Sequence, residues 1–462
     1  MPRQNRRPRP DQPGAAAAPS SLTDLDDRPS KPKKRAWKGD FQAGAPDFFQ
    51  SQTTAAENKL GHRDALVGTE AERVVIGLPL KAFSLQYLYS SSVYPLGRME
   101  MKIGESDSCK TAKLFESGRW FLREPGGGFI YLLNEGRDPA DLRTSIIGEG
   151  LLGGGGFRLE GPCAALEDWQ RRTTGWLHKV EANFKKIGGC AFPFMLGLDS
   201  ITGTTNEKAI ANIDEEGCAK LTFGQDANLL NQYAKYLFQR VYRWPIAFIC
   251  TNHIKYGQDR HGNKVMRIPG GDELRYASTY ITHLSKSKDI DRLDVAGGRR
   301  IVVKTMKSMG DRREVVVDFV WNYDANGIQT SLWDWHAASV ELLMNFSGEK
   351  GKRVEEIIEF RDVSKPRRTC ACPALGIRKA DSYDAVGKAL MENSQVLTAL
   401  QNHFGIKRRR EFQTNVPYVD QIEEAIKARE VEKHSSADIG KVQSSDEEVS
   451  EVLIDSPPEE AT

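Results

Sequence analysis

Short apolar runs alternate with longer amphipathic stretches between about residues 98 and 319. The short runs predict strands at Arg98–Gly104, Phe129–Leu133, Phe192–Leu198 and Ile246–Cys250. Apolar positions three and four residues apart predict helices over Lys110–Arg123, Leu166–Ile187 and Ala227–Tyr242. Strands that alternate with helices of this length favour βαβ units, and therefore a mostly parallel sheet with helices on both faces.

After Tyr280 the pattern changes, because strand-like runs follow one another without a helix between them. These runs are Thr279–Leu284, Arg300–Met306 and Glu314–Trp321. They predict an antiparallel extension at one edge of the sheet. We therefore assign residues 76–325 to an α/β core. Residues 326–430 mix helical stretches with a Pro/Cys-containing middle, Lys365–Pro373, and predict a smaller α-rich C-terminal domain.

The two ends of the chain carry opposite charge. Residues 1–40 hold ten Lys/Arg and five Asp among Pro, Ala and Ser, and residues 435–462 hold eight acidic residues and one lysine. Such compositions bury too little apolar surface to fold, so we predict a disordered basic arm at 1–40 and a disordered acidic tail at 431–462. Residues 41–75 would be a linker or a small N-terminal oligomerisation element. One interpretation is that the basic arm contacts a phosphate backbone and the acidic tail competes with that backbone. The alternative is that both ends simply keep the protein in solution.

Composition excludes several classes of protein. Of the 462 residues, 39% are hydrophobic and 28% charged, and no run approaches the roughly 18–20 apolar residues that a membrane span needs. The basic start lacks the apolar core of a secretory signal. Seven cysteines form no disulfide framework, which favours a reducing, cytoplasmic compartment. The close pair Cys370 and Cys372 lacks further ligands at zinc spacing.

The sharpest local signal is the octet GESDSCKT between the first predicted strand and its helix, the position that a phosphate-binding loop requires. The candidate nucleotide-binding residues are Gly104, Glu105, Ser106, Asp107, Ser108, Cys109, Lys110 and Thr111. Lys110 would reach the β- and γ-phosphates at the helix N-terminus, and the Thr111 hydroxyl would ligate Mg²⁺. Cys109 stands where such loops usually have glycine, so either the loop is reshaped or nucleotide affinity is lowered. The alternative is a polar turn that contains lysine by chance.

Polar residues end the later strands in the same way. Glu135 and Asp138 follow the second strand, Asp199 ends the third, and His253 follows the fourth. The carboxyl edge of parallel strands is where ligands bind in open α/β sheets. Asp199 would hold Mg²⁺ through water. One such aspartate is more often a cap or turn residue, but chance does not readily explain an ordered series.

Short motifs follow one another along this core. They are YPLGR (Tyr94–Arg98), GESDSCKT (Gly104–Thr111), NEGRDP (Asn134–Pro139), LDS (Leu198–Ser200), TNHI (Thr251–Ile254), PGGDELRYAS (Pro269–Ser278) and VVKTMK (Val302–Lys307). With them, the chain from about Ser84 to Tyr323 resembles the bacterial RecA recombinases, and within them the divergent phage-type relatives. The PGGDELRYAS block is the most specific, because generic P-loop ATPases lack it. Roughly half of the chain takes part.

The resemblance implies a RecA-like doubly wound ATPase core that polymerises on single-stranded DNA as a helical filament, with ATP between subunits, and pairs that strand with homologous double-stranded DNA. Glu135 would activate the attacking water, and Asp138 would lie in the nucleotide site. Lys304 and Lys307 would reach the neighbouring subunit's ATP in trans, unless they form a solvated face. A bacterial cytoplasm is implied, and the divergence suggests a phage or prophage origin.

His253 stands where the family has a glutamine that senses the γ-phosphate. Histidine still donates a hydrogen bond but titrates near pH 6.5 when unperturbed. One hypothesis is therefore that coupling between ATP and DNA depends on pH through His253. The alternative is a histidine tolerated as a neutral isostere.

The segment after His253 is basic and rich in glycine, which suits contact with a single-stranded backbone. The candidate DNA-binding residues are Lys255, Arg260, Lys264, Met266, Arg267, Ile268, Gly270 and Gly271. A second loop, Thr202–Leu221, offers Lys208 and Lys220, but four acidic residues weaken the case for it. The alternative for both is an exposed hairpin loop without a ligand.

The leading interpretation is a DNA-dependent ATPase that uses ATP and Mg²⁺ to promote strand exchange. A ring helicase or motor with the same core is a competitor, against which the PGGDELRYAS block argues. A non-hydrolysing scaffold that binds single-stranded DNA is another, which Cys109 and His253 keep open.

Overall fold

The computed structural model describes residues 75–135, 156–189, 191–203, 205–216, 225–258, 261–290, 297–323, 329–346, 354–414 and 416–428. The predicted basic arm, the linker up to residue 74 and the predicted acidic tail lie outside the described residues. So do Asp138 and Arg260 and most of the glycine-rich stretch 148–156.

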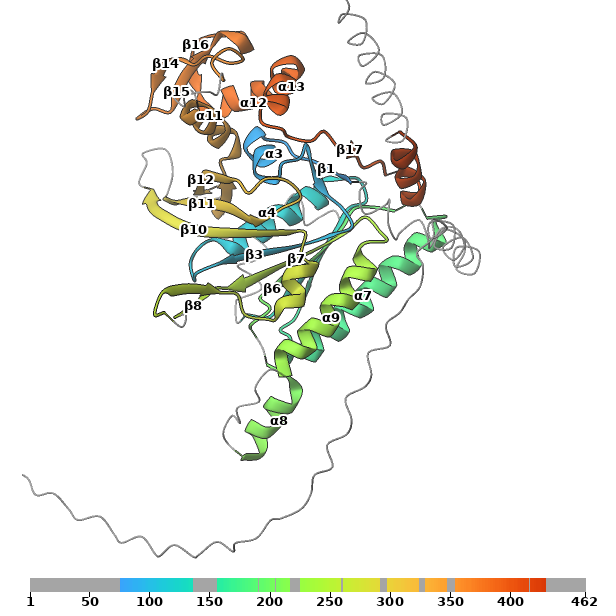
Figure 1. Cartoon of the computed structure of the whole chain (residues 1–462). Helices are drawn as coiled ribbons and strands as arrows, with labels where there is room; N and C mark the ends of the chain where they lie inside the picture. Colours follow the sequence, from blue (N-terminus) through green and yellow to red (C-terminus); the bar gives the residue numbers. More distant parts are fainter. Residues whose placement is uncertain are drawn as a thin grey trace, which may run out of the picture. The chain divides into compact units, whose positions relative to one another are not determined.

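Within the described residues, a nine-stranded sheet has the order β13-β12-β11-β10-β3-β7-β6-β4-β5 (Figure 1). The strands are β3 (Arg98–Gly104), β4 (Gly128–Leu133), β5 (Phe157–Glu160), β6 (Phe194–Asp199), β7 (Ile246–His253), β10 (Tyr280–Ile290), β11 (Gly298–Lys307), β12 (Glu314–Tyr323) and β13 (Gln329–Trp333). Neighbours from β10 to β5 are parallel, whereas β11, β12 and β13 are antiparallel to their neighbours. The prediction of a mostly parallel sheet with an antiparallel extension at one edge is confirmed.

Helices cover both faces of this sheet (Figure 1). They include α4 (Lys110–Arg123) on one face and α7 (Leu166–Lys186) and α9 (Gln225–Val241) on the other. Successive residues of a strand point to opposite faces. Tyr131 of β4 therefore packs on Phe115 of α4, whereas Leu132 joins the cluster of α7 and α9. Burial of each such side chain stabilises the fold by about 1.5–3 kcal/mol.

The amphipathic pattern of α7 correctly predicted which side of this helix faces the sheet, because Trp169, Leu177 and Val180 on its apolar side are buried. Two further helices lie in the segments that connect these elements along the chain. They are α8 (Glu207–Glu216) and α10 (Asp272–Ala277).

Residues after 334 form most of a third core, which Phe83 also joins. The elements are α11 (Trp335–Phe346), β14 (Arg361–Ser364), β15 (Thr369–Cys372), a 3-10 turn η3 (Pro373–Leu375), β16 (Ile377–Ser382), α12 (Tyr383–Glu392) and α13 (Ser394–His403). The Pro/Cys-containing middle of this region is thus a three-stranded antiparallel sheet, which the sequence pattern did not predict. Cys370 and Cys372 are fully buried in this core, and burial raises the pKa of Cys370 to about 12.

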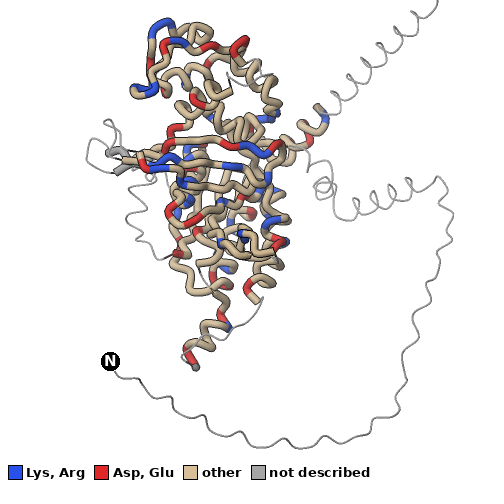
Figure 2. The backbone as a smooth tube through the Cα atoms, turned by 60° about the vertical axis from the view of Figure 1, so that its left-hand side comes forward, with Lys and Arg blue, Asp and Glu red and all other residues tan. Residues whose placement is uncertain are grey.

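The chain then returns to its beginning. Strand β17 (Arg410–Glu411) pairs in parallel with β1 (Ile76–Pro79), which also pairs with β2 (Val93–Pro95), and α3 (Phe83–Tyr89) packs against α11. Figure 2 shows Lys and Arg interspersed with Asp and Glu along the described chain. No helix in the described ranges is both long and apolar enough to cross a membrane.

Candidate functional site

The loop between β3 and α4, residues 104–111, folds tightly on itself. A Cβ on Gly104 would lie 2.4 Å from the Leu284 carbonyl oxygen and 2.4 Å from Ser108 Oγ, so only glycine fits there. Ser108 Oγ donates to the Glu105 carbonyl oxygen at 2.8 Å, and Lys110 Nζ donates to the same oxygen at 2.6 Å. The Cys109 side chain does not cap α4, which leaves the first-turn N–H groups without an acceptor from that residue.

Cys109 adopts the backbone conformation that glycine favours, with φ 61° and ψ 27°. Asp107 is also left-handed, with φ 68°. Each such residue with a Cβ costs about 1–2 kcal/mol. The sequence left open whether cysteine reshapes this loop, and the structure shows that it retains the left-handed turn. Burial raises the pKa of the Cys109 thiol, although nearby Arg299 opposes that effect.

Arg299, near the start of β11, contacts this loop from a distant part of the chain. Its Nη1 donates to the Asp107 carbonyl oxygen at 2.8 Å and to Asp107 Oδ1 at 2.5 Å, and it lies 4.0 Å from Cys109 Sγ. Sequence reasoning missed Arg299, because no local signal joins two residues 192 positions apart.

Asp199 ends β6 in a buried site beside the loop, with 1% of its surface exposed. Its carboxylate accepts hydrogen bonds from three described hydroxyl groups: Thr111 at 2.6 Å, Tyr131 at 3.0 Å, and Thr251. These donors come from α4, β4 and β7, so the two candidate metal ligands, Thr111 and Asp199, are brought together. Sequence reasoning did not include Tyr131, which lies within an apolar run.

Glu135 and His253 meet at the same edge of the sheet. His253 Nε2 lies 3.2 Å from Glu135 Oε1, and both side chains are partly exposed. Next to them, Asn134 donates through Nδ2 to the Ser200 carbonyl oxygen at 2.8 Å, which fixes the end of β4 against β6. The candidate residues at three strand ends therefore converge, as the carboxyl-edge rule predicts.

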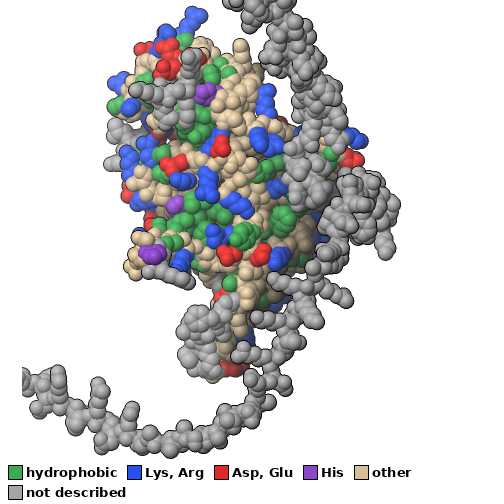
Figure 3. All heavy atoms as spheres, viewed as in Figure 1, with side chains coloured by type: hydrophobic (Ala, Val, Ile, Leu, Met, Phe, Trp, Pro, Cys, Tyr) green, Lys and Arg blue, Asp and Glu red, His purple; other side chains and the backbone are tan. Residues whose placement is uncertain are grey.

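The basic segment after His253 is a β-hairpin rather than an unpaired loop. Strands β8 (Lys255–Gln258) and β9 (Lys264–Arg267) pair antiparallel. The backbone N–H of Ile254 donates to the Gly104 carbonyl oxygen at 3.3 Å, which ties the base of the hairpin to the 104–111 loop. Lys255, Lys264 and Arg267 are exposed. Figure 3 shows basic side chains gathered with hydrophobic ones on the face that Figure 1 presents.

The hairpin divides its larger side chains between the core and solvent. Met266 and Ile268 pack against the core, so they are less available to a ligand than the sequence suggested. Tyr256 and Val265 are exposed instead, and Lys264 Nζ lies 3.9 Å from the centre of the Tyr256 ring. Partial desolvation and the nearby Glu105 carboxylate raise the pKa of Tyr256. Tyr256 was missed, although an aromatic residue among basic ones is a signal for base stacking.

The two glycines of the PGGDELRYAS block have backbone conformations that favour glycine. Gly270 has φ 101° and Gly271 has φ 87°. A Cβ on Gly271 would lie 2.3 Å from Asn231 Oδ1. Asn252 Nδ2 donates to the Pro269 carbonyl oxygen at 2.7 Å, which connects the end of β7 to this block.

Lys304 and Lys307 lie on β11 and bond to residues outside the 104–111 loop. Lys304 is half exposed and lies 3.6 Å from Glu314 of β12. Lys307 Nζ donates to the carbonyl oxygens of Arg275 at 3.0 Å and Tyr276 at 2.7 Å, in the last turn of α10. The structure therefore does not bring these two lysines together with the other candidate residues.

The second predicted loop, Thr202–Leu221, contains the helix α8. Glu207 in its first turn pairs with Arg171 at 2.5 Å, which ties it to α7. Lys208 lies on the exposed side of α8, and Lys220 lies outside the described residues.

Immediately after Thr111 and Ala112, the helix α4 carries a buried lysine. Lys113 Nζ lies 2.5 Å from Glu116 Oε2, and 4.5 Å and 4.4 Å from the ring centres of Trp120 and Trp335. Trp335 Nε1 donates to Glu116 Oε1 at 2.5 Å, so α4 is joined to α11. Burial lowers the pKa of Lys113 to about 8 against the opposing effect of Glu116.

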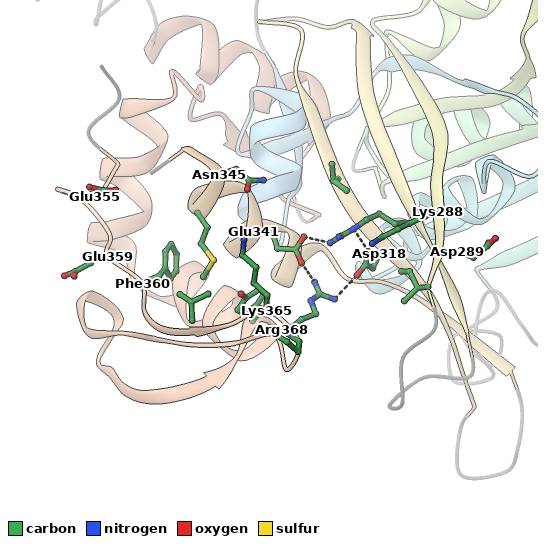
Figure 4. Close-up of a pocket in the computed structure, with 17 residues that line it drawn as sticks. Lys288, Asp289, Asp318, Glu341, Asn345, Glu355, Glu359, Phe360, Lys365 and Arg368 are labelled. Atoms are coloured by element: carbon green, nitrogen blue, oxygen red, sulfur yellow. Dashed lines mark hydrogen bonds and ion pairs between the residues drawn. The ribbon is translucent and has the colours of Figure 1, made fainter. Parts of the chain in front are cut away.

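A cleft of about 1100 Å³ lies between β11–β12 and the C-terminal elements (Figure 4). Arg300 and Arg368 line this cleft and pair with Asp318 at 3.0 and 2.9 Å, and both also pair with Glu341. Because these charges neutralise one another, the cluster joins the sheet to the C-terminal core and does not favour a charged ligand.

Neither the protein-family models nor the curated proteins contain a match to this chain.

Proposed function

We propose that the protein is a RecA-type DNA-dependent ATPase that polymerises on single-stranded DNA and promotes its pairing with homologous duplex. The motifs in the sequence support this proposal. The observation that carries it is the convergence of two pairs at one sheet edge, Thr111 with Asp199 at 2.6 Å and His253 with Glu135 at 3.2 Å.

The residues at this edge fit a nucleotide and Mg²⁺. Lys110 and the N–H groups that begin α4 provide positive charge for phosphates. The Thr111 hydroxyl and the Asp199 carboxylate provide oxygen ligands, which Mg²⁺ prefers. Bound there, Mg²⁺ would neutralise charge on the phosphate oxygens. Lys110 would exchange its bond to the Glu105 carbonyl for one to a phosphate.

Glu135 is the candidate general base. Its carboxylate is partly exposed and would accept the proton of the attacking water, while His253 holds its orientation. His253 ends β7, and the next residue, Ile254, begins the hairpin bonded to Gly104. Binding or loss of the γ-phosphate would therefore be transmitted to the hairpin through His253 and Ile254.

The hairpin is the candidate contact for single-stranded DNA. Lys255, Lys264 and Arg267 would contact phosphates, and Tyr256 would stack on a base. In a filament, Lys304 would face the neighbouring subunit's nucleotide. Its side chain is half exposed, and its ion pair with Glu314 is long, at 3.6 Å. Lys307 would first have to leave its carbonyl partners in α10.

ATP hydrolysis with and without a single-stranded oligonucleotide tests this proposal. We expect Glu135→Gln to reduce DNA-stimulated turnover by about 100-fold or more, because a general base contributes roughly 10²–10⁴-fold. Nucleotide binding should remain, since Lys110 and Thr111 are unchanged. The matched control is Glu392→Gln at the exposed end of α12, which should retain full turnover.

The outcomes separate the competing functions. Turnover that depends on the oligonucleotide, with filaments in electron micrographs, supports the proposal. Turnover with closed rings favours a helicase or motor. Binding of ATP and DNA without turnover in the parent favours a scaffold, and absence of nucleotide binding refutes all three.

A further inference from the structure

An arginine of the antiparallel extension contacts the middle of the 104–111 loop. Arg299 Nη1 bonds both the backbone and the side chain of Asp107, and the guanidinium reaches Cys109 Sγ at 4.0 Å. The Arg299 side chain is 20% exposed, whereas the Asp107 side chain is 64% exposed. Among the described residues, Asp289 of β10 is a second acidic neighbour, 3.9 Å from Arg299 Nε. Of these two acidic neighbours, Asp107 of the loop is the closer one.

These contacts fall on the strained part of the loop. Asp107 and Cys109 are both left-handed, and both carry a Cβ that disfavours this conformation. Glycine would hold such a turn without help, but the chain has cysteine at the helix N-cap. The bonds from Arg299 to Asp107 would therefore stabilise a turn that a loop with glycine at position 109 would adopt without them.

We propose that Arg299 is a positioning residue that holds the 104–111 loop in its left-handed turn and so compensates for cysteine at position 109. This inference rests on the nucleotide-binding role proposed above. Arg299 acts through the loop and is not a ligand of the phosphates. Its loss should therefore weaken nucleotide binding only while residue 109 is a cysteine.

A double-mutant cycle tests this dependence. Arg299→Ala should weaken ATP binding about tenfold and raise the KM for ATP with little change in kcat. In the Cys109→Gly background the same change should weaken binding about twofold or less. Arg299→Lys should restore part of the affinity, because both bonds to Asp107 come from one nitrogen. Lys288→Ala, which removes an exposed charge opposite Arg300 in the β10–β11 ladder, is the charge-matched control.

A second measurement does not require nucleotide. Hydrogen exchange of the peptide spanning residues 104–114 should be about tenfold faster in Arg299→Ala than in the parent or in Lys288→Ala. The Lys113 N–H, bonded to the Cys109 carbonyl oxygen at 3.0 Å, is the reporter. Exchange in the Cys109→Gly, Arg299→Ala double variant should be close to that of the parent.

The outcomes are distinct. Equal losses of affinity in both backgrounds would show that Arg299 contacts the nucleotide itself and would overturn the proposal, as would unchanged exchange in Arg299→Ala. If the parent binds no ATP but exchange is faster in Arg299→Ala than in the parent, the proposed function is refuted and the role of Arg299 in the loop is supported.

Discussion

The edge of the sheet that holds Asp199 and the hairpin that follows His253 are neighbours with opposite character. Asp199 is buried, and its two carboxylate oxygens are used by hydroxyls from three elements. The hairpin has exposed lysines and an exposed tyrosine. One region is ordered by its own bonds, whereas the other exposes its basic side chains to solvent. Substitutions should therefore affect stability in the first region and binding in the second.

The largest expected effect is at Asp199. Asp199→Ala leaves buried hydroxyls without their acceptor, each at a cost of about 1–3 kcal/mol. We expect the free energy of unfolding to fall by about 3 kcal/mol or more and ATP turnover to fall by at least about 100-fold. Asp199→Asn keeps the shape and one acceptor, so it should lose turnover with a smaller loss of stability. Urea unfolding and ATPase assays measure both, and a stable but inactive Asp199→Ala would contradict the argument from burial.

The second prediction concerns the hairpin. Replacing Lys255, Arg260, Lys264 and Arg267 with alanine should weaken binding of a single-stranded oligonucleotide by about 100-fold at low salt, because phosphate contacts dominate such affinity. The free energy of unfolding should change by less than about 0.5 kcal/mol, as for ordinary surface substitutions. Fluorescence anisotropy at several salt concentrations measures the affinity and its salt dependence.

A matched control for the hairpin is a set of exposed cations elsewhere, namely Lys365, Arg367, Arg378 and Lys379 replaced with alanine. Their loss removes the same charge from the C-terminal elements. If both quadruple variants lose DNA binding equally, net charge rather than the hairpin determines affinity.

The third prediction tests the buried lysine below the ordered edge. The pKa of Lys113 is lowered to about 8, so between about pH 8 and 10.5 the unfolded chain binds more protons than the folded one. Stability from this group should therefore rise with pH across that window, by about 2 kcal/mol. The difference in free energy of unfolding between the parent and Lys113→Met should change accordingly between pH 7.5 and 10. Lys388→Met, at an exposed Asp384 pair, should show no such change.

The smallest effect is expected at Cys109. Because the loop already has the left-handed turn without a ligand, Cys109→Gly should raise stability by less than about 1 kcal/mol and change ATP affinity less than about threefold. Cys109→Val should reduce both, since β-branched residues strongly disfavour this conformation. An affinity gain of tenfold or more in Cys109→Gly would mean that the turn forms only on binding.

Local patterns predicted the elements that position the candidate site. The strand Arg98–Gly104 and the helix Lys110–Arg123 have the predicted bounds, and the strand that ends at Asp199 differs from its prediction by two residues at its start and one at its end. The two strands of the hairpin were not predicted, because their apolar residues are few. The sheet formed by β14, β15 and β16 was missed because its strands are short and only partly buried.

The order of the strands and helices that carry the candidate site, and the polar residues at the ends of those strands, were determined by the sequence alone. Residue spacing carries that information, and parallel strands place their carboxyl ends at one edge. Only the tertiary structure decided which distant side chains reach that edge. Tyr131 joins Asp199, Arg299 holds Asp107, and Trp335 bonds Glu116, across 68, 192 and 219 positions of sequence. Such contacts depend on how sheet and helices pack, and no periodicity of the chain encodes them.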